Sequence, residues 1–200
     1  MNTLLHIKAS LFADQGQSSQ LSDAYVANWR ERHADGQVIT RDFARTPMPH
    51  LDGATFQAFL TPATQRNAEQ QAAVDWSDSL IAELALSDLQ VIGLPMYNLG
   101  MPSMLKAWFD HVMRAGKTFR YTEAGPQGLL QGKKALVFAT RGGRYAGTAG
   151  DVQTQYVRKL LAFMGITEVE FVYAEGLNMG DAAKADGLAQ AHEALAALPV

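Results

Sequence analysis

Apolar and polar residues follow two different periods along the chain, and their order predicts a sheet whose strands alternate with helices. Five short apolar runs have the length and composition of strands, and they cover residues 3–8, 37–43, 89–93, 134–139 and 168–173. Apolar residues recurring every three or four positions predict helices after residues 18–22 and over residues 62–86, 102–114, 151–164 and 182–198. This alternation predicts an α/β fold, a doubly wound five-stranded parallel sheet with helices on both faces.

Two segments interrupt the alternation. Residues 44–61 contain two prolines, a glycine and scattered apolar residues, and we expect a meandering cover there rather than a domain linker. Residues 116–132 are rich in turn residues and aromatic rings, which suggests an excursion at the edge of the sheet that overhangs a pocket. Neither segment divides the chain, so residues 1–200 are predicted to form a single domain with one core.

Charge and composition narrow the choice of partners. The net charge is −3, with 17 basic and 20 acidic residues mixed along the chain, so no basic patch favours nucleic acid or an anionic membrane. There is no cysteine for disulfides or thiol chemistry, and no run approaches the roughly 20 apolar residues of a membrane span. The five histidines lack metal-ligand spacing, so no metal site is expected. The cytoplasm is the expected compartment.

The loop after the first strand carries Ser10, Gln17 and Ser18 ahead of a helix N-terminus, and it contains no lysine or arginine. Free amides and hydroxyls at a helix N-terminus suit a bound phosphate without a counter-cation. Ser18, Ser19 or Ser22 is also typical of a purely structural helix cap. Because the loop lacks G-x-x-x-x-G-K-[ST] and G-x-G-x-x-G, a nucleoside triphosphatase or a standard dinucleotide site is disfavoured.

Two later strands end in loops that also suit a ligand. Met96, Tyr97 and Asn98 supply a thioether, a ring and an amide that could hold a flat heterocycle, although an ordinary strand-to-helix turn fits them as well. Residues 140–143 combine a hydroxyl with two glycines whose amides can approach a ligand closely, although Gly-Gly also marks simple turns. Ligands of such sheets bind at the carboxyl ends of strands, so one ligand touching all three loops is the economical hypothesis.

These residues carry a family resemblance, through segments that occur in the order Ser10 to Ser18, Pro95-Met96-Tyr97-Asn98, Lys106-Ala107-Trp108-Phe109-Asp110, Gly116-Lys117-Thr118-Phe119-Arg120-Tyr121, Gly128-Leu129-Leu130 and Arg141-Gly142-Gly143. The chain resembles, over essentially its whole length, the FMN-dependent NADH-azoreductase family of flavodoxin-like quinone reductases. The Pro-Met-Tyr-Asn and Thr-Phe-Arg-Tyr segments are the specific part of this likeness. It implies a homodimer with two FMN sites at the subunit interface, and reduction of quinones and azo compounds with NADH or NADPH as donor.

The resemblance also implies roles for individual residues. Those implied to bind FMN are Ser10, Gly16, Gln17 and Ser18 at the phosphate, Met96, Tyr97, Asn98 and Leu99 along the isoalloxazine, and Thr140, Arg141, Gly142 and Gly143 at its pyrimidine side. Those implied to shape the substrate pocket are Leu99, Tyr121, Tyr145 and Phe163, although Phe163 also fits a core position. Gly16 stands where relatives often have serine, and Leu99 where many have phenylalanine.

We expect a two-step exchange in which NAD(P)H reduces the flavin, leaves, and is replaced by the acceptor. No side chain is assigned as a catalytic acid or base, because the flavin carries the chemistry. The glycine amides at 142 and 143 are expected to favour the reduced flavin's negative charge. Arg114, Lys117 and Arg120 are interpreted as solvated charges near a helix end, able to steer an anionic substrate. The alternative function is a flavodoxin-like electron carrier without its own small-molecule substrate.

Overall fold

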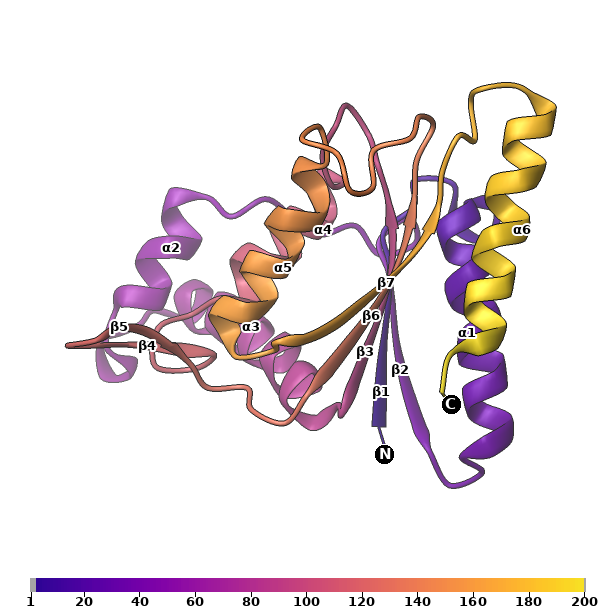
Figure 1. Ribbon diagram of the computed structural model, residues 1–200. Helices are drawn as coiled ribbons and strands as arrows, with labels where there is room; N and C mark the ends of the chain where they lie inside the picture. The colour runs from indigo at the N-terminus through magenta and orange to yellow at the C-terminus, as the bar shows by residue number, and fades with distance from the viewer. Residues whose placement is uncertain (1–2, 200) are drawn as a thin grey trace.

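Five parallel strands form the central sheet of the computed structural model, which describes residues 3–199 (Figure 1). They are β1 (Thr3–Lys8), β2 (Gln37–Asp42), β3 (Leu89–Pro95), β6 (Lys134–Thr140) and β7 (Glu168–Ala174). Their spatial order is β2-β1-β3-β6-β7, and each neighbouring pair is parallel. The chain winds outward in one direction from β1 to β2 and in the other from β3 onward, so the topological switch point lies between β1 and β3.

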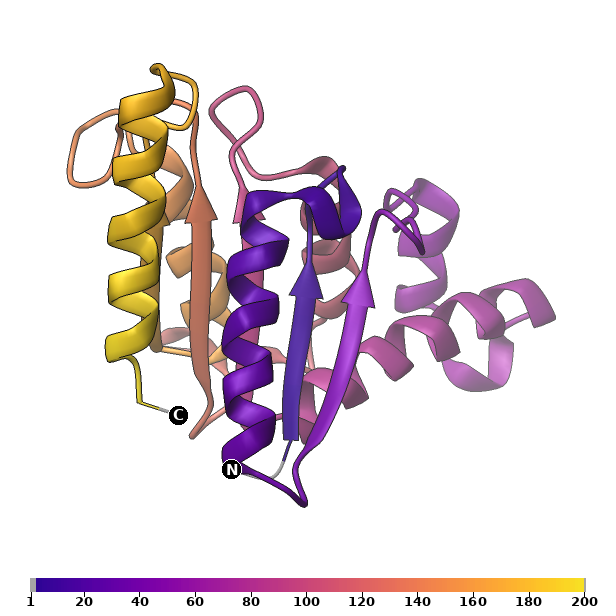
Figure 2. The same cartoon turned by 90° about the vertical axis from the view of Figure 1, so that its right-hand side faces the viewer.

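Helices cover both faces of this sheet. Helices α1 (Gln17–Arg32) and α6 (Asp181–Ala197) lie on one face, and α3 (Ala68–Leu86), α4 (Ser103–Val112) and α5 (Val152–Met164) lie on the other (Figures 1 and 2). The short α2 (Gly53–Leu60) packs against α3. The prediction of a doubly wound parallel sheet is therefore confirmed. In the described part, no helix is long and apolar enough to cross a membrane.

The two faces of the sheet form two separate apolar layers. Leu4 and Val91 pack with Trp29 of α1, whereas Leu5 and Ile92 pack with the helices of the opposite face. Every residue of β1 and β3 is buried, because helices cover both of their faces. The near-continuous apolar runs that predicted these strands follow from this double burial.

Three local predictions need correction. Residues 44–61 contain helix α2, which begins where the Asp52 carboxylate accepts a hydrogen bond from Thr55 N at 2.7 Å. The helix expected from residue 62 is instead a 3₁₀ turn, Ala63–Gln65, followed by α3 after an Asn67 capping box. Residues 116–132 form a separate antiparallel hairpin, β4 (Phe119–Thr122) and β5 (Gly125–Gly128), which packs against α5 beyond the central sheet (Figure 1).

Candidate functional site

The carboxyl ends of β1, β3 and β6 enclose a cavity of about 220 Å³ at the switch point of the sheet. Figure 2 shows the loops that leave these strands gathered at the end where α1 and α6 both begin. Fourteen residues line the cavity: Ser10, Phe12, Gly16, Gln17, Ser18, Pro95, Met96, Tyr97, Thr140, Arg141, Gly142, Leu177, Asn178 and Lys184. All three predicted loops therefore reach one site.

The first loop presents hydrogen-bond donors to the cavity. Gly16 is the N-cap of α1, so the first helical amides, from Gln17 to Ser19, have no intrahelical acceptor. The Ser18 hydroxyl is buried and has no hydrogen-bond partner in residues 3–199. The prediction that a serine side chain caps this helix is wrong, because no side chain bonds to its N-terminus. Gly16 N already donates to Ala13 O at 3.2 Å, which leaves the following amides as the available donors.

Ion pairs hold this loop against the sheet. The buried Lys8 Nζ lies 2.6 Å from Asp14 Oδ1 in the loop and 2.8 Å from Asp23 Oδ2 in α1. Burial opposes the charge of Lys8, but hydrogen bonds to the two carboxylates outweigh it and raise the lysine pKa. Hydrogen bonds from Lys8 and Arg45 lower the pKa of Asp14. The carboxylate of Asp14 thus forms ion pairs with both Lys8 and Arg45.

The second loop is a tight turn in a restricted backbone conformation. Tyr97 and Gly100 exchange two backbone hydrogen bonds of 3.0 Å, and between them Asn98 and Leu99 have φ of 49° and 66°. A bulky residue such as leucine is uncommon and strained at positive φ, and such strain clusters at functional sites. Tyr97 Oη also accepts a hydrogen bond of 3.2 Å from Leu11 N, which joins this turn to the first loop.

The third loop is held by a buried arginine. Arg141 is 1% exposed and binds Asp151 Oδ1 at 2.9 Å and Glu175 Oε1 at 3.1 Å. The same Glu175 oxygen accepts hydrogen bonds of 2.9 Å from the amides of Tyr145 and Ala146. Burial raises the pKa of Asp151, but hydrogen bonds from Arg141 and Thr154 outweigh it and hold that pKa below its usual value. Both Nη atoms of Arg141 are therefore engaged by groups of the protein, whereas the buried Nε has no partner in residues 3–199.

The glycines of the third loop leave donors free. Gly142 O and Gly143 O accept hydrogen bonds of 3.0 Å from Asn178 N and Gly176 N. The amides of Gly142 and Gly143 have no acceptor within residues 3–199. A Cβ at residue 142 would lie 2.6 Å from Asn178 Nδ2, so the absence of a side chain allows this close approach.

Not every predicted residue lines the cavity of this chain. Asn98, Leu99 and Gly143 belong to its loops but lie outside its lining. Tyr145 rests against Gly143, whose Cβ would meet the tyrosine ring at 3.0–3.2 Å. Tyr121, on the hairpin, is 73% exposed.

Two further interpretations concern residues away from the cavity. Phe163 is half-buried, packs on the buried Phe119 with ring centroids 4.6 Å apart, and belongs to neither apolar layer of the sheet. Arg114 was expected to be solvated and is instead buried, with Nη1 2.6 Å from Asp78 Oδ1.

Sequence reasoning missed one side of the cavity. Leu177, Asn178 and Lys184 follow β7 and reach the cavity because β7 lies beside β6. No local motif marks them, since their proximity to Ser10 is produced by the strand order.

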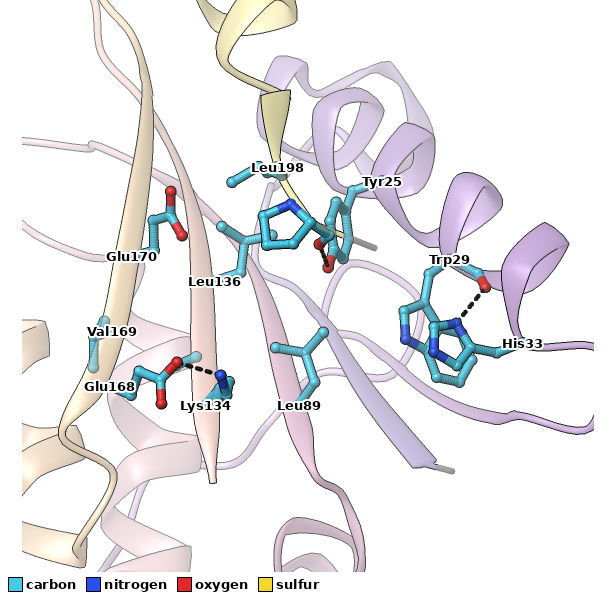
Figure 3. Close-up of a pocket in the computed structure, with 12 residues that line it drawn as sticks. Tyr25, Trp29, His33, Leu89, Lys134, Leu136, Glu168, Val169, Glu170 and Leu198 are labelled. Carbon is cyan, nitrogen blue, oxygen red and sulfur yellow. Dashed lines mark hydrogen bonds and ion pairs between the residues drawn. The ribbon is translucent and has the colours of Figure 1, made fainter. Parts of the chain in front are cut away.

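A larger cavity of about 600 Å³ opens at the amino ends of β3, β6 and β7, where none of the predicted site residues lies. Its wall includes Tyr25, Trp29 and Leu136, and the Lys134–Glu168 ion pair of 2.5 Å lies at one side (Figure 3). Ligands of open α/β sheets bind at the opposite, carboxyl ends of the strands. The smaller cavity is therefore the candidate site.

Comparisons with known proteins agree with this architecture. A family model described as a flavodoxin-like fold matches residues 2–198. The chain is 54% identical over 197 residues to an FMN-dependent NADH:quinone oxidoreductase of Alcanivorax borkumensis (strain ATCC 700651 / DSM 11573 / NCIMB 13689 / SK2), covering 98% of this chain and 99% of the relative. It is 53% identical over 180 residues to an FMN-dependent NADH:quinone oxidoreductase of Cellvibrio japonicus (strain Ueda107), covering 90% of each.

A solved structure gives the same result in three dimensions. The crystal structure of an azoreductase from Bacillus anthracis str. Sterne matches with a TM-score of 0.88 and 28% identity, over 98% of both chains. The resemblance stated from the sequence is confirmed by these matches. The chain belongs to the flavodoxin-like family that includes the FMN-dependent NADH:quinone oxidoreductases.

Proposed function

We propose that this chain is an FMN-dependent NADH:quinone oxidoreductase whose cofactor lies in the cavity at the carboxyl ends of β1, β3 and β6. The observation that carries the proposal is the convergence of unpaired donors on that cavity. The helical amides from Gln17, the Ser18 hydroxyl and the Gly142 amide line the cavity and have no hydrogen-bond partner within the described residues. Two relatives, 54% and 53% identical over 98% and 90% of this chain, bear the name of this activity.

The residues present fit FMN. A phosphate needs several donors, and the start of α1 together with the buried Ser18 hydroxyl supplies them. A flat ring needs a shallow wall with few polar contacts, and Met96 and Tyr97 provide a thioether and an aromatic face beside the cavity. The amides of Gly142 and Gly143 would donate to the polar edge of the ring.

When bound, FMN supplies the hydride chemistry, taking two electrons from NADH and passing them to a quinone. The chain's own residues bind and orient. The Arg141–Asp151 and Arg141–Glu175 ion pairs hold the third loop, whose Gly142 lines the cavity. The amides of this loop would stabilise negative charge on the edge of a bound flavin without reorganising during the reaction. Donor and acceptor would use the same opening in turn, which gives two-step kinetics, and we include azo compounds among the acceptors.

We also propose that two copies of the chain form the active species. A ligand pocket usually has about 300–1,000 Å³, whereas this cavity has about 220 Å³ and holds only part of a flavin nucleotide. Apolar side chains near its mouth are open to solvent, among them Phe12 at 66% and Leu99 at 56% exposed. A second copy could cover both the ring and these side chains. Light scattering should give twice the 21.8 kDa mass of one chain, and a stable monomer would contradict this part.

An anaerobic titration with NADH tests the function. The protein reconstituted with FMN should lose its yellow colour on addition of NADH and regain it on addition of a quinone. If NADH does not bleach the flavin, the electron-carrier alternative is favoured. If the chain does not bind FMN at all, the proposal is wrong. Initial rates that give parallel double-reciprocal lines would support the two-step exchange.

We also propose the cytoplasm as the compartment of the protein, because the proposed electron donor, NADH, is a cytoplasmic nucleotide.

A further inference from the structure

Lys184 is an exposed residue that lines the cavity, and its side chain has no hydrogen-bond or ion-pair partner among residues 3–199. It belongs to the second turn of α6, and it lines the cavity together with Ser10, Gly16 and Ser18 of the first loop. Its ammonium makes no ion pair with any residue between 3 and 199, unlike the other cation of the cavity, Arg141. The cavity therefore contains one positive charge that no carboxylate of the described chain neutralises.

Hydrogen bonds fix the part of the chain that leads to this lysine. Leu177 N donates to Arg141 O at 3.2 Å, and Asn178 N donates to Gly142 O at 3.0 Å, so the segment after β7 is tied to the third loop. Helix α6 then approaches the end of β7 so closely that a Cβ at Gly187 would lie 2.0 Å from Glu175 O. These contacts define where α6 begins, one turn before Lys184.

The position is unfavourable for a cation unless an anion is present. The N-terminus of a helix carries partial positive charge, so a lysine near it is destabilising on its own. The N-terminus of α1 faces the same cavity with unpaired amides, and both helices begin at this end of the sheet (Figure 2). The Ser18 hydroxyl, buried and without a partner, is an independent sign that a ligand group is expected there.

We infer that Lys184 is the counter-cation of the FMN phosphate and adds to the preference of the site for FMN over riboflavin. This inference rests on the proposed function, because it assigns a role toward the cofactor of that same site. It also replaces the expectation that the serine loop binds phosphate without a cation. The loop's own sequence lacks lysine and arginine because the charge comes from α6, far along the chain.

Flavin binding to the apoprotein tests the inference without reference to turnover. Dissociation constants for FMN and for riboflavin would be measured from quenching of flavin fluorescence at low and high salt. The proteins would be wild type, Lys184→Gln, Lys184→Arg and Lys159→Gln. Lys159 is a matched control, an exposed lysine on α5, on the other face of the sheet, with no ion pair in the described part.

Lys184→Gln should weaken FMN binding roughly three- to tenfold, the effect of one charge-assisted contact at an exposed site, and leave riboflavin binding unchanged. Lys184→Arg should keep most of the FMN affinity, and Lys159→Gln should match wild type. Higher salt should reduce the difference between wild type and Lys184→Gln. Equal losses for FMN and riboflavin, or no loss for either, would overturn the inference while leaving the proposed function intact. A wild-type protein that binds neither flavin would overturn both.

Discussion

One methyl group at residue 16 should weaken FMN binding, because the first loop folds back on itself at Gly16. A Cβ at this position would lie 2.0 Å from Ser10 Oγ and 2.5 Å from Ser10 Cβ. Rotation of the Ser10 side chain relieves the first overlap, but the second involves an atom attached directly to the backbone. Gly16 has φ of −71° and ψ of 133°, which any residue adopts, so the penalty of Gly16→Ala comes from the contact alone.

The size of the effect follows from overpacking. Forcing an extra methyl group into a filled space costs about 1–3 kcal/mol, through movement of side chains and backbone. If the apoprotein relieves the overlap by moving the loop, this free energy must be restored when FMN draws Ser10 and the α1 amides together. The dissociation constant for FMN should then rise about 5-fold to 150-fold, since each 1.4 kcal/mol is a factor of ten.

Titration of the apoprotein with FMN measures the effect, and two variants control it. Gly53→Ala adds the same methyl group where nothing lies within 4 Å, so it should leave FMN affinity unchanged. The pair Ser10→Gly and Ser10→Gly/Gly16→Ala forms a double-mutant cycle, in which adding the methyl group without the Ser10 side chain should have little further effect. The reasoning is refuted if Gly16→Ala binds FMN as tightly as Gly53→Ala does.

Other substitutions test the acceptor face, a buried histidine and a helix cap. Leu99→Phe should raise kcat/KM for a small flat quinone about two- to tenfold, because ring stacking adds about 0.5–1.5 kcal/mol. FMN affinity should stay unchanged. If the variant and the wild type show the same ratio of kcat/KM between a small quinone and a bulky azo dye, Leu99 does not belong to the acceptor site. Burial lowers the pKa of His6 to about 4, so the unfolded chain takes up a proton first as the pH falls from about 6.5 to 4. The free energy of unfolding should therefore drop by about 3 kcal/mol between pH 6.5 and pH 4. If urea melts of His6→Gln show the same drop as wild type, protonation of His6 is not its cause. Asn67→Ala removes the Asn67–Gln70 capping box of α3 and should lower the free energy of unfolding by about 1 kcal/mol, so an unchanged urea midpoint would count against the cap.

The strands could be predicted because a strand that is buried on both faces of the sheet requires a run of apolar residues in the sequence. A strand covered by helices on each side needs apolar residues at nearly every position, and β3 and β6 carry such runs. The ends of helices were harder to predict. Thr61-Pro62, followed by apolar residues at helical spacing, predicted one helix from residue 62, although Asn67 and Gln70 have the spacing of a capping box. Asp52 and Thr55 mark α2 in a similar way, and the nearby prolines obscured it.

Some residues of the site could be predicted because they directly follow a strand, whereas others reach the cavity only through the arrangement of the fold. Ser10, Met96 and Thr140 each follow a parallel strand directly, so knowing the strands was enough to predict that they meet at one edge of the sheet. Lys184 reaches the same cavity through β7, a glycine-containing turn and a helix placed on the α1 face, and no spacing along the chain encodes that route. What the sequence does carry is a lysine near the N-terminus of a helix, where a cation is unfavourable. In folds whose helices all begin at the ligand end of the sheet, a lysine of this kind is a signal worth testing before the structure is known, because an anionic ligand offsets its unfavourable position.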